Sequence, residues 1–392
     1  MEPYQNRYRW VILSLLWLLY VAFGLINRAL APLVTPILKD LHLSYTQMGM
    51  ILGSWQLTYI FVAILSGTLI DKWGVRRSLL AGAIIIGLSS ALRYFPMGFW
   101  TMLGAVALFG VGGSMISTGC PKAISIWFRG KNQGTAVGIY LTGPQIGGIL
   151  ALSFTNSLVM PLTGNSWRYT FLVYGLLTFM IASLWGFLAK DTELPMSNED
   201  AGIFAIFARL IRVRNVQIVL IMGLLTFAIS HGFTNWLPKI LESSGLSPAS
   251  AGFTASLPIA AGIPSCLIFP SLVLPQSRGR FISLSALLTI VTLILSMTTS
   301  GRVQLAGLIL FGIIISSFFP ILTLILMDIP EVGSRYMGAA AGMFFCFAEI
   351  GGCTGPWIMG ALFDVTGAFL AGALFFAGLS LTTFFLSLHL KI

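Results

Sequence analysis

The chain has 392 residues, of which 57% are hydrophobic and only 9% are charged. Soluble globular domains carry about 25% charged residues, so this composition excludes an ordinary soluble protein and indicates one that crosses the membrane several times. The formal net charge is +10. Such a basic balance would also suit a nucleic-acid-binding protein, and the position of the charges along the chain decides between the two interpretations.

Twelve apolar segments are long enough to cross a bilayer, which takes roughly 20 apolar residues in a helix. We expect spanning helices at 10–37, 45–70, 78–95, 99–127, 133–160, 168–189, 215–238, 248–273, 280–299, 303–328, 336–361 and 367–389. The first segment is too long for a cleaved signal peptide, carries Arg28 and lacks Ala-x-Ala spacing. We therefore predict an all-α membrane protein with twelve transmembrane helices.

The lysines and arginines lie mostly on one side of these segments. When the N-terminus is placed inside, the outer connections hold only Lys39, Arg93, Arg168, Lys239 and Arg302. Cytoplasmic connections of membrane proteins carry an excess of lysine and arginine, so we predict that both termini are cytoplasmic. The basic excess thus orients a multi-pass protein in the cell's inner (plasma) membrane, and no nucleic-acid partner is expected.

One long hydrophilic connection, at 191–214, divides the chain into an N-terminal set of six spans (1–190) and a C-terminal set (215–392). Its second part mixes arginines with apolar residues, and Ser197 or Asn198 can cap a helix there. We expect a basic amphipathic helix that lies on the inner leaflet.

A shift of 204 residues aligns part of the fifth span with part of the eleventh. The matching stretches are Gly134-x-Ala136-x-Gly138 with Gly338-x-Ala340-x-Gly342, and Gln145-Ile-Gly-Gly148 with Glu349-Ile-Gly-Gly352. The shift is about half the chain length and moves the fifth span onto the eleventh, six spans later. This indicates two related bundles of six helices. Transporters built from such repeats hold their substrate between the repeats, near the middle of the membrane.

The connection after the second span reads Gly67-Thr-Leu-Ile-Asp71-Lys72-Trp-Gly74-Val-Arg76-Arg77. A glycine, an acid four residues later, a turn glycine and a basic cluster form a tight elbow between two helices. The segment resembles the signature loop between helices 2 and 3 of the major facilitator superfamily. A segment like Asn235-Trp-Leu-Pro238, at the end of the seventh span, is also common in that superfamily. Val75 departs from that signature, which often has arginine there, and the corresponding loop of the second half, 276–280, lacks the acid.

This resemblance implies two pseudo-symmetric six-helix bundles that move a small solute by alternating access. It also implies a gating role for the loop, with Asp71, Arg76 and Arg77. Asp71 is expected to accept hydrogen bonds from backbone N–H groups at a neighbouring helix start, or to pair with a cytoplasmic arginine such as Arg129. Either contact would hold the outward-open state, and the alternative is that Asp71 only shapes the elbow.

Glycine and proline recur in the fifth and eleventh spans, as Gly143-Pro144 and Gly355-Pro356. Glycines admit neighbouring backbones and proline bends a helix, so we favour bent, closely packed helices. The fifth-span pattern also resembles a motif of facilitator antiporters, with Ile139 in place of one glycine. A specific antiporter is the alternative interpretation.

Ionisable side chains inside a bilayer are costly and usually functional. Arg28 stands in the first span beside Asn27, and Tyr20 lies on the same helix face. The Asn27-Arg28 pair resembles an Asp-Arg pair in helix 1 of the organic anion symporters of the superfamily, in which the arginine faces the cavity and helps to hold the substrate carboxylate. A guanidinium suits this task because its planar fork can bond both oxygens. The alternative is an arginine that bonds backbone carbonyls or extends to the interface.

Further residues of the spans are candidates for lining the substrate pocket: Tyr59, Tyr140, Gln145, His231, Asn235 and Trp236, with Trp55 and Gln56. Aromatic side chains in spans also serve as packing and interface anchors, and a packed, neutral histidine is an equally good interpretation of His231.

Two more ionisable residues lie inside spans. Glu349, near the middle of the eleventh span, is expected to carry the coupling proton, and the alternative is an interhelical hydrogen bond made by its protonated form. Lys122, near the cytoplasmic end of the fourth span, is expected to extend to the inner headgroups or else to add positive potential to the cavity.

Other kinds of chemistry find no support in the sequence. The four cysteines lie inside spans, with no Cys-x-x-Cys pair or histidine cluster beside them, so neither a disulfide framework nor a metal site is indicated. The chain has no Gly-x4-Gly-Lys-Ser/Thr loop, no Ser-His-Asp arrangement and no channel selectivity filter. We expect no enzymatic activity, metal or cofactor.

We therefore predict a monomeric secondary transporter that moves a small organic anion, such as a carboxylate, together with protons. A proton-driven exporter of hydrophobic or drug-like compounds is the alternative, although Arg28 argues against a cationic drug. A receptor or enzyme with a transporter-like fold is disfavoured, because a soluble domain and a catalytic constellation are both missing from the sequence.

Overall fold

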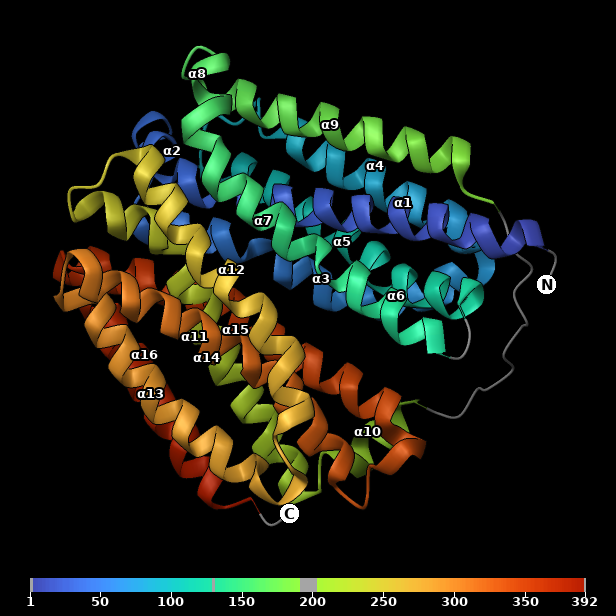
Figure 1. Ribbon diagram of the computed structural model, residues 1–392. Coiled ribbons are helices and arrows are strands. Elements are labelled where there is room, and N and C mark those ends of the chain that lie inside the picture. Colours follow the sequence, from blue (N-terminus) through green and yellow to red (C-terminus); the bar gives the residue numbers. More distant parts are fainter. Residues whose placement is uncertain (1–2, 129–130, 191–202, 391–392) are drawn as a thin grey trace. The chain divides into compact units, whose positions relative to one another are not determined.

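The computed structural model describes residues 3–128, 131–190 and 203–390, and these residues are almost entirely helical (Figure 1). In this part of the chain, eleven helical segments are long and apolar enough to cross a membrane. Helix α3 (Tyr45–Trp73), which bends by 58° between Ala63 and Leu65, brings the number to twelve. The prediction of an all-α protein with twelve transmembrane helices is confirmed.

The helices pack into two compact units. Unit 1 consists of Met1–Leu43, Ser54–Ser197 and Leu241–Ser256, and unit 2 of Ser44–Gly53, Asn198–Ile240 and Leu257–Ile392. Unit 1 contains most of α3 and all of α1 (Pro3–Arg28), α2 (Val34–Asp40), α4 (Val75–Leu92), α5 (Phe99–Trp127), α6 (Lys131–Leu141), α7 (Gly143–Phe154), α8 (Met160–Leu162) and α9 (Trp167–Leu188). Unit 2 contains all or most of α10 (Ile203–Leu210), α11 (Arg214–Ser243), α12 (Pro248–Leu272), α13 (Arg278–Thr298), α14 (Gly301–Asp328), α15 (Gly333–Thr366) and α16 (Phe369–Leu388).

Glycines bring pairs of helix backbones into contact within each unit. In unit 1, α1 lies against α7, and a Cβ added at Gly147 would overlap the backbone oxygen of Val21. In unit 2, a Cβ added at Gly351 would overlap the backbone oxygen of Leu224 in α11. Gly147 and Gly351 correspond in the sequence repeat, so the close packing predicted for these spans occurs at equivalent positions of the two units.

The two proline motifs behave differently. In the fifth span, α6 ends at Leu141 and α7 begins at Gly143, with Pro144 in its first turn. Proline lacks the N–H group that would continue the helical ladder. Helix α15, in contrast, runs as one helix through Pro356. The sequence predicted a bend at both prolines. The structure has a helix break at the proline of the fifth span and one continuous helix through the proline of the eleventh.

The starts of two helices pack with the opposite half of the sequence. The start of α3 belongs to unit 2, where a Cβ added at Gly49 would overlap the backbone oxygen of Pro356 in α15. The start of α12 belongs to unit 1, where a Cβ added at Gly252 would overlap the backbone oxygen of Leu152 in α7. Each compact unit therefore contains a short segment from the other set of spans.

The amphipathic helix expected in the linker is present as α10. Leu210 is fully buried in a hydrophobic cluster of unit 2, and Ile206 and Phe207 pack against that cluster. The guanidinium of Arg209 lies 5.5 Å from the ring of Tyr336 in α15. These apolar residues of α10 therefore contact protein, and the expected contact of the helix with the inner leaflet stays a prediction. The expected capping positions, 197 and 198, lie outside the described residues.

Candidate functional site

In unit 1, four candidate substrate residues, Tyr20, Trp55, Tyr59 and Tyr140, belong to one aromatic cluster. The rings of Tyr20 and Tyr140 meet edge to face, with 5.4 Å between their centroids. Trp55 lies 5.9 Å from Tyr59, and Phe23 joins the two pairs, 5.9 Å from Tyr20 and 6.2 Å from Trp55. Side chains from α1, α3 and α6 thus bring three predicted tyrosines together, and we call these five rings the tyrosine cluster.

Asn27 and Arg28 are the last two residues of α1. Both side chains are half-buried, and the amide nitrogen of Asn27 is buried without a hydrogen-bond partner. A buried donor without a partner costs about 1–3 kcal/mol, a cost that an oxygen atom of a ligand would remove. Gln145, in the first turn of α7, is also half-buried. The end of α1 therefore offers an unsatisfied amide donor next to a guanidinium.

In unit 2, Glu349 lies on α15 and only 7% of it is exposed. Within the described part of the chain its Oε2 atom finds no hydrogen-bond partner. In such surroundings, burial of a carboxyl group costs much less free energy when the group is neutral than when it is charged. Its charge would therefore respond strongly to any change in the access of water, as a proton carrier requires.

The remaining candidates of unit 2 lie on α11. The half-buried ring of His231 lies 5.6 Å from that of Phe227, and Asn235 is buried. Trp236 is fully buried, and its Nε1 donates to the backbone oxygen of Pro356 at 2.9 Å. This hydrogen bond gives Trp236 a packing role between α11 and α15, whereas His231 and Asn235 stay candidates for substrate contact.

Polar contacts link the loop of residues 67–77 to other helices of unit 1. Asp71 forms an ion pair with Lys122 of α5, and Arg76 donates from Nη2 to the backbone oxygen of Gly186 in α9 at 2.7 Å. Lys122 therefore has a protein partner where the sequence led us to expect a lipid headgroup. The described partner of Asp71 is thus a lysine. The expected pairing with Arg129 stays a prediction, because Arg129 lies outside the described residues, and Arg77 is exposed.

Unit 2 contains a corresponding ion pair with the charges exchanged. Arg278, the first residue of α13, pairs with Asp328, the last residue of α14. In unit 1 the loop between spans carries the acid and the fourth span the base, whereas in unit 2 the loop carries the base and the tenth span the acid. This pair was not predicted, because the second loop lacks the acid that the signature loop carries. The separations of 51 and 50 residues between the partners are the signal that could have revealed it.

The start of α3 is capped by an acid of α15. Asp364 accepts hydrogen bonds from the backbone N–H groups of Tyr45 (3.1 Å) and Thr46 (2.7 Å). Ser44 and Gln47 add a capping box, with bonds of 3.0 and 3.1 Å between side chain and backbone. A carboxylate is favoured at the positive end of a helix. The Ser-x-x-Gln pattern can be read in the sequence, but the distant acid cannot.

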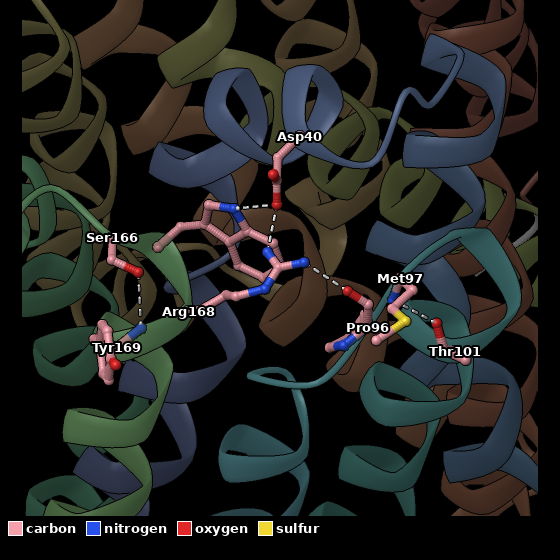
Figure 2. A network of polar contacts seen from close by, with 8 residues as sticks. Asp40, Pro96, Met97, Thr101, Ser166, Arg168 and Tyr169 are labelled. Carbon is pink, nitrogen blue, oxygen red and sulfur yellow. Dashed lines mark hydrogen bonds and ion pairs between the residues drawn. The ribbon is translucent and has the colours of Figure 1, made fainter.

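Asp40 belongs to a polar network that links the end of α2, the start of α9 and the connection from α4 to α5 (Figure 2). Asp40, at the end of α2, accepts from Nε1 of Trp167 at 3.1 Å and pairs with Arg168 at the start of α9. Arg168 also donates to the backbone oxygen of Pro96 at 2.7 Å. The sequence predicted for Arg168 only a place in an outer connection. In the structure its side chain links α2, the start of α9 and the connection from α4 to α5. Among the described residues, no group of three or more His, Cys, Asp or Glu could hold a metal ion.

Comparison with known proteins agrees with this architecture. The family model of the Major Facilitator Superfamily matches residues 16–356. A hexuronate transporter of Bacillus subtilis (strain 168) is 24% identical over 382 residues, which cover 91% of this chain and 89% of that protein. A probable sulfoacetate transporter of Cupriavidus necator is 23% identical and covers 94% and 92%, and the quinolone resistance protein NorA of Staphylococcus aureus (strain Mu50) is 23% identical and covers 92% and 91%.

A solved structure shows the same fold. A bacterial homologue of the human lysosomal transporter Spinster matches with a TM-score of 0.79 at 14% sequence identity, over 99% of this chain and 98% of that chain. The fold and the family inferred from the loop of residues 67–77 are both confirmed. The chain is a multi-pass membrane transporter rather than an enzyme, and it belongs to the major facilitator superfamily.

Proposed function

We propose that this transporter moves a small organic anion, most simply a carboxylate, by alternating access across the inner (plasma) membrane and couples the movement to protons. The observation that carries the proposal is the pair at the end of α1. Arg28 supplies a guanidinium, and Asn27 supplies a buried amide that has no partner. A carboxylate needs several donors around its two oxygens, and an amide and a guanidinium are donors of the kind that it needs.

Two of the relatives are named for organic anions. Hexuronate and sulfoacetate are both organic anions, and the two proteins named for them match along most of their length. The tyrosine cluster adds hydroxyl groups to unit 1, which suit a polar substrate with several oxygen atoms. A charge-assisted anchor with neutral hydroxyls around it is a common way to hold such a substrate.

We assign the coupling proton to Glu349. Its counterpart in the sequence repeat is the neutral Gln145, so the repeat has one titratable member at this depth. The unpartnered Oε2 atom supports the assignment because proton release then depends on whether water reaches the group. His231 is the next candidate.

Alternating access needs contacts that form in one state and break in the other. Helix α3 has candidates for such contacts at its two ends. Its start donates backbone N–H groups to Asp364, and its last turn carries Asp71, which pairs with Lys122. We assign the first contact to the outer gate and the second, with Arg76 and Arg77, to the inner gate.

Binding measurements on variants of Arg28 test the substrate assignment. Arg28→Lys keeps the charge and loses the fork, whereas Arg28→Ala loses both. The loss of a charged bond in a desolvated site costs about 2–5 kcal/mol, which is roughly 30-fold to several-thousand-fold in affinity. Arg302→Ala, which removes an exposed arginine, is the matched control. A carboxylate affinity in Arg28→Ala equal to that of the unmodified protein would contradict the assignment.

A proton-driven exporter of hydrophobic compounds is the second candidate. The similarity to a quinolone resistance protein and the Gly143-Pro144 break in the fifth span favour it. A thermal-shift screen separates the two functions. Stabilisation by lipophilic cations, with no response to carboxylates or sulfonates, would favour the exporter.

A further inference from the structure

Corresponding helix contacts show which residues of the two units occupy equivalent positions. In unit 1, a Cβ added at Gly110 in α5 would overlap the backbone oxygen of Trp55 in α3. In unit 2, a Cβ added at Gly312 in α14 would overlap the backbone oxygen of Pro258 in α12 in the same way. Helices α3 and α5 of unit 1 therefore correspond to α12 and α14 of unit 2, in a register that these two contacts fix.

In this register, a hydroxyl pair of unit 1 corresponds to two residues of unit 2 that have no hydroxyl. Four residues after the contact positions of α3 and α12 stand Tyr59 and Gly262. Seven residues after the two contact glycines stand Ser117 and Phe319. The hydroxyl oxygens of Tyr59 and Ser117 lie 2.8 Å apart and share a hydrogen bond. Unit 2 has a glycine and a phenyl ring in place of this pair.

Tyr20, another member of the tyrosine cluster, follows the same pattern. The close contact of α7 with α1 falls on the backbone oxygen of Val21, and that of α15 with α11 falls on the backbone oxygen of Leu224. The residues directly before these two are Tyr20 in unit 1 and Gly223 in unit 2. A tyrosine of unit 1 again corresponds to a glycine of unit 2.

The third tyrosine, Tyr140, corresponds to Phe344 in the sequence repeat of the fifth and eleventh spans. In unit 1 the rings of Tyr20 and Tyr140 are in contact, with 5.4 Å between their centroids. In unit 2 a Cβ added at Gly223 would lie 2.5 Å from the ring of Phe344. The same two positions are thus neighbours in both units, which supports the register, and the third hydroxyl is replaced by a phenyl ring.

Phenylalanines gather in unit 2 around these equivalent positions. The ring centroid of Phe319 lies 5.1 Å from that of Phe345 and 5.7 Å from that of Phe344. The ring centroid of Phe227 in α11 lies 6.0 Å from that of Phe319. We call these four rings, which come from α11, α14 and α15, the phenylalanine cluster.

Part of the phenylalanine cluster is open to a ligand. Phe344 is buried, but 40% of Phe345 is exposed, and Phe227 and Phe319 are half-buried. The half-buried ring of His231 lies 5.6 Å from that of Phe227. The cluster therefore offers aromatic surface with one polar side chain at its edge.

We propose that the phenylalanine cluster binds an aryl group of the transported anion, so that the preferred substrates are aryl carboxylates such as benzoate. This inference rests on the proposed transport of organic anions. Transporters built from repeats bind their substrate with both repeats, and the phenylalanine cluster occupies in unit 2 the positions that the tyrosine cluster occupies in unit 1.

The chemistry of the cluster favours an aryl group over a hydroxylated one. Phenyl rings attract a further aromatic ring edge to face or offset, beyond the gain from burial alone. A sugar acid placed against the same rings would lose hydrogen bonds to water and gain none from these side chains. The oxygen atoms of an aryl carboxylate are left to the tyrosine cluster and to the pair at the end of α1.

Calorimetric titration of the purified full-length protein tests the proposal with three probes at neutral pH: benzoate, glucuronate and benzylammonium. Glucuronate keeps the carboxylate and replaces the aryl ring with a hydroxylated one, whereas benzylammonium keeps the aryl ring and reverses the charge. We expect benzoate to bind about tenfold more tightly than either of the other two, a difference of about 1.4 kcal/mol.

Substitution of single rings locates the binding surface. Phe319→Leu removes the ring and keeps an apolar side chain, so it should weaken benzoate binding about fivefold and leave glucuronate binding unchanged. Phe227→Leu probes the same surface and keeps the test valid if Phe319→Leu folds poorly. Phe311→Leu is the matched control, because Phe311 lies on the same helix as Phe319 but is fully buried against Phe233, 4.9 Å away, outside the cluster.

An equal loss of benzoate binding in Phe311→Leu would overturn the proposal, because the loss would then reflect helix packing. Glucuronate binding at least as tight as benzoate binding, with neither changed by Phe319→Leu, would also overturn it and would leave the transport of organic anions intact. Tighter binding of benzylammonium than of benzoate would instead contradict the proposed function, and the preference for aryl carboxylates would fall with it.

Discussion

Buried polar atoms without a partner mark two of the predicted functional residues, the amide nitrogen of Asn27 and Oε2 of Glu349. Burial of an ionisable group is not by itself a sign of function, as Arg93 shows. The sequence places Arg93 in an outer connection, but only 2% of it is exposed, and it donates to the backbone oxygen of Ile26 (3.2 Å) and to the hydroxyl of Ser89 (3.3 Å). Its Nε atom is also buried without a partner, so such an atom supports a functional role only together with other observations.

Glu349→Gln tests proton coupling at the residue scale. The amide has nearly the same shape as the carboxyl group but cannot release a proton, so exchange of substrate across the membrane should continue. Accumulation of substrate driven by a pH gradient should be lost. Both quantities can be measured in proteoliposomes, with the exposed Glu331→Gln as the control. A Glu349→Gln protein that still concentrates substrate would move the proton to another group, with His231 the first to examine.

At the scale of helices, the glycine contacts explain why α1 and α7, and likewise α11 and α15, can approach so closely. Gly147→Ala and Gly351→Ala should each destabilise the protein by about 1–3 kcal/mol, the usual cost of overpacking. Gly138 and Gly342 correspond to each other in the repeat, lie on the same two spans and have no atom within 4 Å of an added Cβ. Their replacement by alanine should be neutral or slightly stabilising.

Thermal unfolding in detergent measures this difference. The account of helix packing would be wrong if all four alanine variants unfolded at the same temperature. It would also be wrong if Gly138→Ala and Gly342→Ala were the more damaging pair.

The helices were predictable from the sequence because lipid imposes a long apolar segment for each span. The glycine contacts were predictable because the repeat brought Gly147 and Gly351 into register. The ion pairs were not, because each joins residues about 50 positions apart and the charges are exchanged between the units. The cap from Asp364 was not predictable either, because its partners at the start of α3 lie more than 300 residues away.

The exchanged charges of the two units suggest a direct test of the ion pair between Asp71 and Lys122. Asp71→Lys should weaken it by placing like charges together, and Asp71→Lys/Lys122→Asp should restore it in the arrangement that Arg278 and Asp328 already adopt. The pair is partly exposed, so its contribution should be about 0.2–1 kcal/mol, or up to about fivefold in the population of access states.

Spin-label distances between the cytoplasmic ends of the two units report that population. If Asp71→Lys changes thermal stability but no distance, Asp71 shapes the elbow and has no part in the gate. If Asp71→Lys/Lys122→Asp does not recover the original distances, the ion pair with Lys122 does not set the population of access states.

At the scale of the whole molecule, transport requires the outer contacts to break when the substrate enters from outside. Asp364→Asn removes the charge from the cap on α3 and keeps its shape, so it should shift the population toward the outward-open state. Capping contacts contribute about 1 kcal/mol, which corresponds to about a fivefold shift. Cysteine accessibility at the outer ends of the spans measures the effect, with Glu331→Gln as the control. Unchanged accessibility would remove Asp364 from the outer gate.

The central claim is that the transported solute is an organic anion that moves with protons. Uptake into proteoliposomes with an imposed pH gradient tests it most directly, with a hexuronate, a simple monocarboxylate, a neutral hexose and a lipophilic cation offered separately. The account predicts that an organic anion accumulates, that other carboxylates compete with it, and that accumulation ends when the gradient is collapsed. Transport of the hexose or the lipophilic cation, with carboxylates neither transported nor competing, would contradict it.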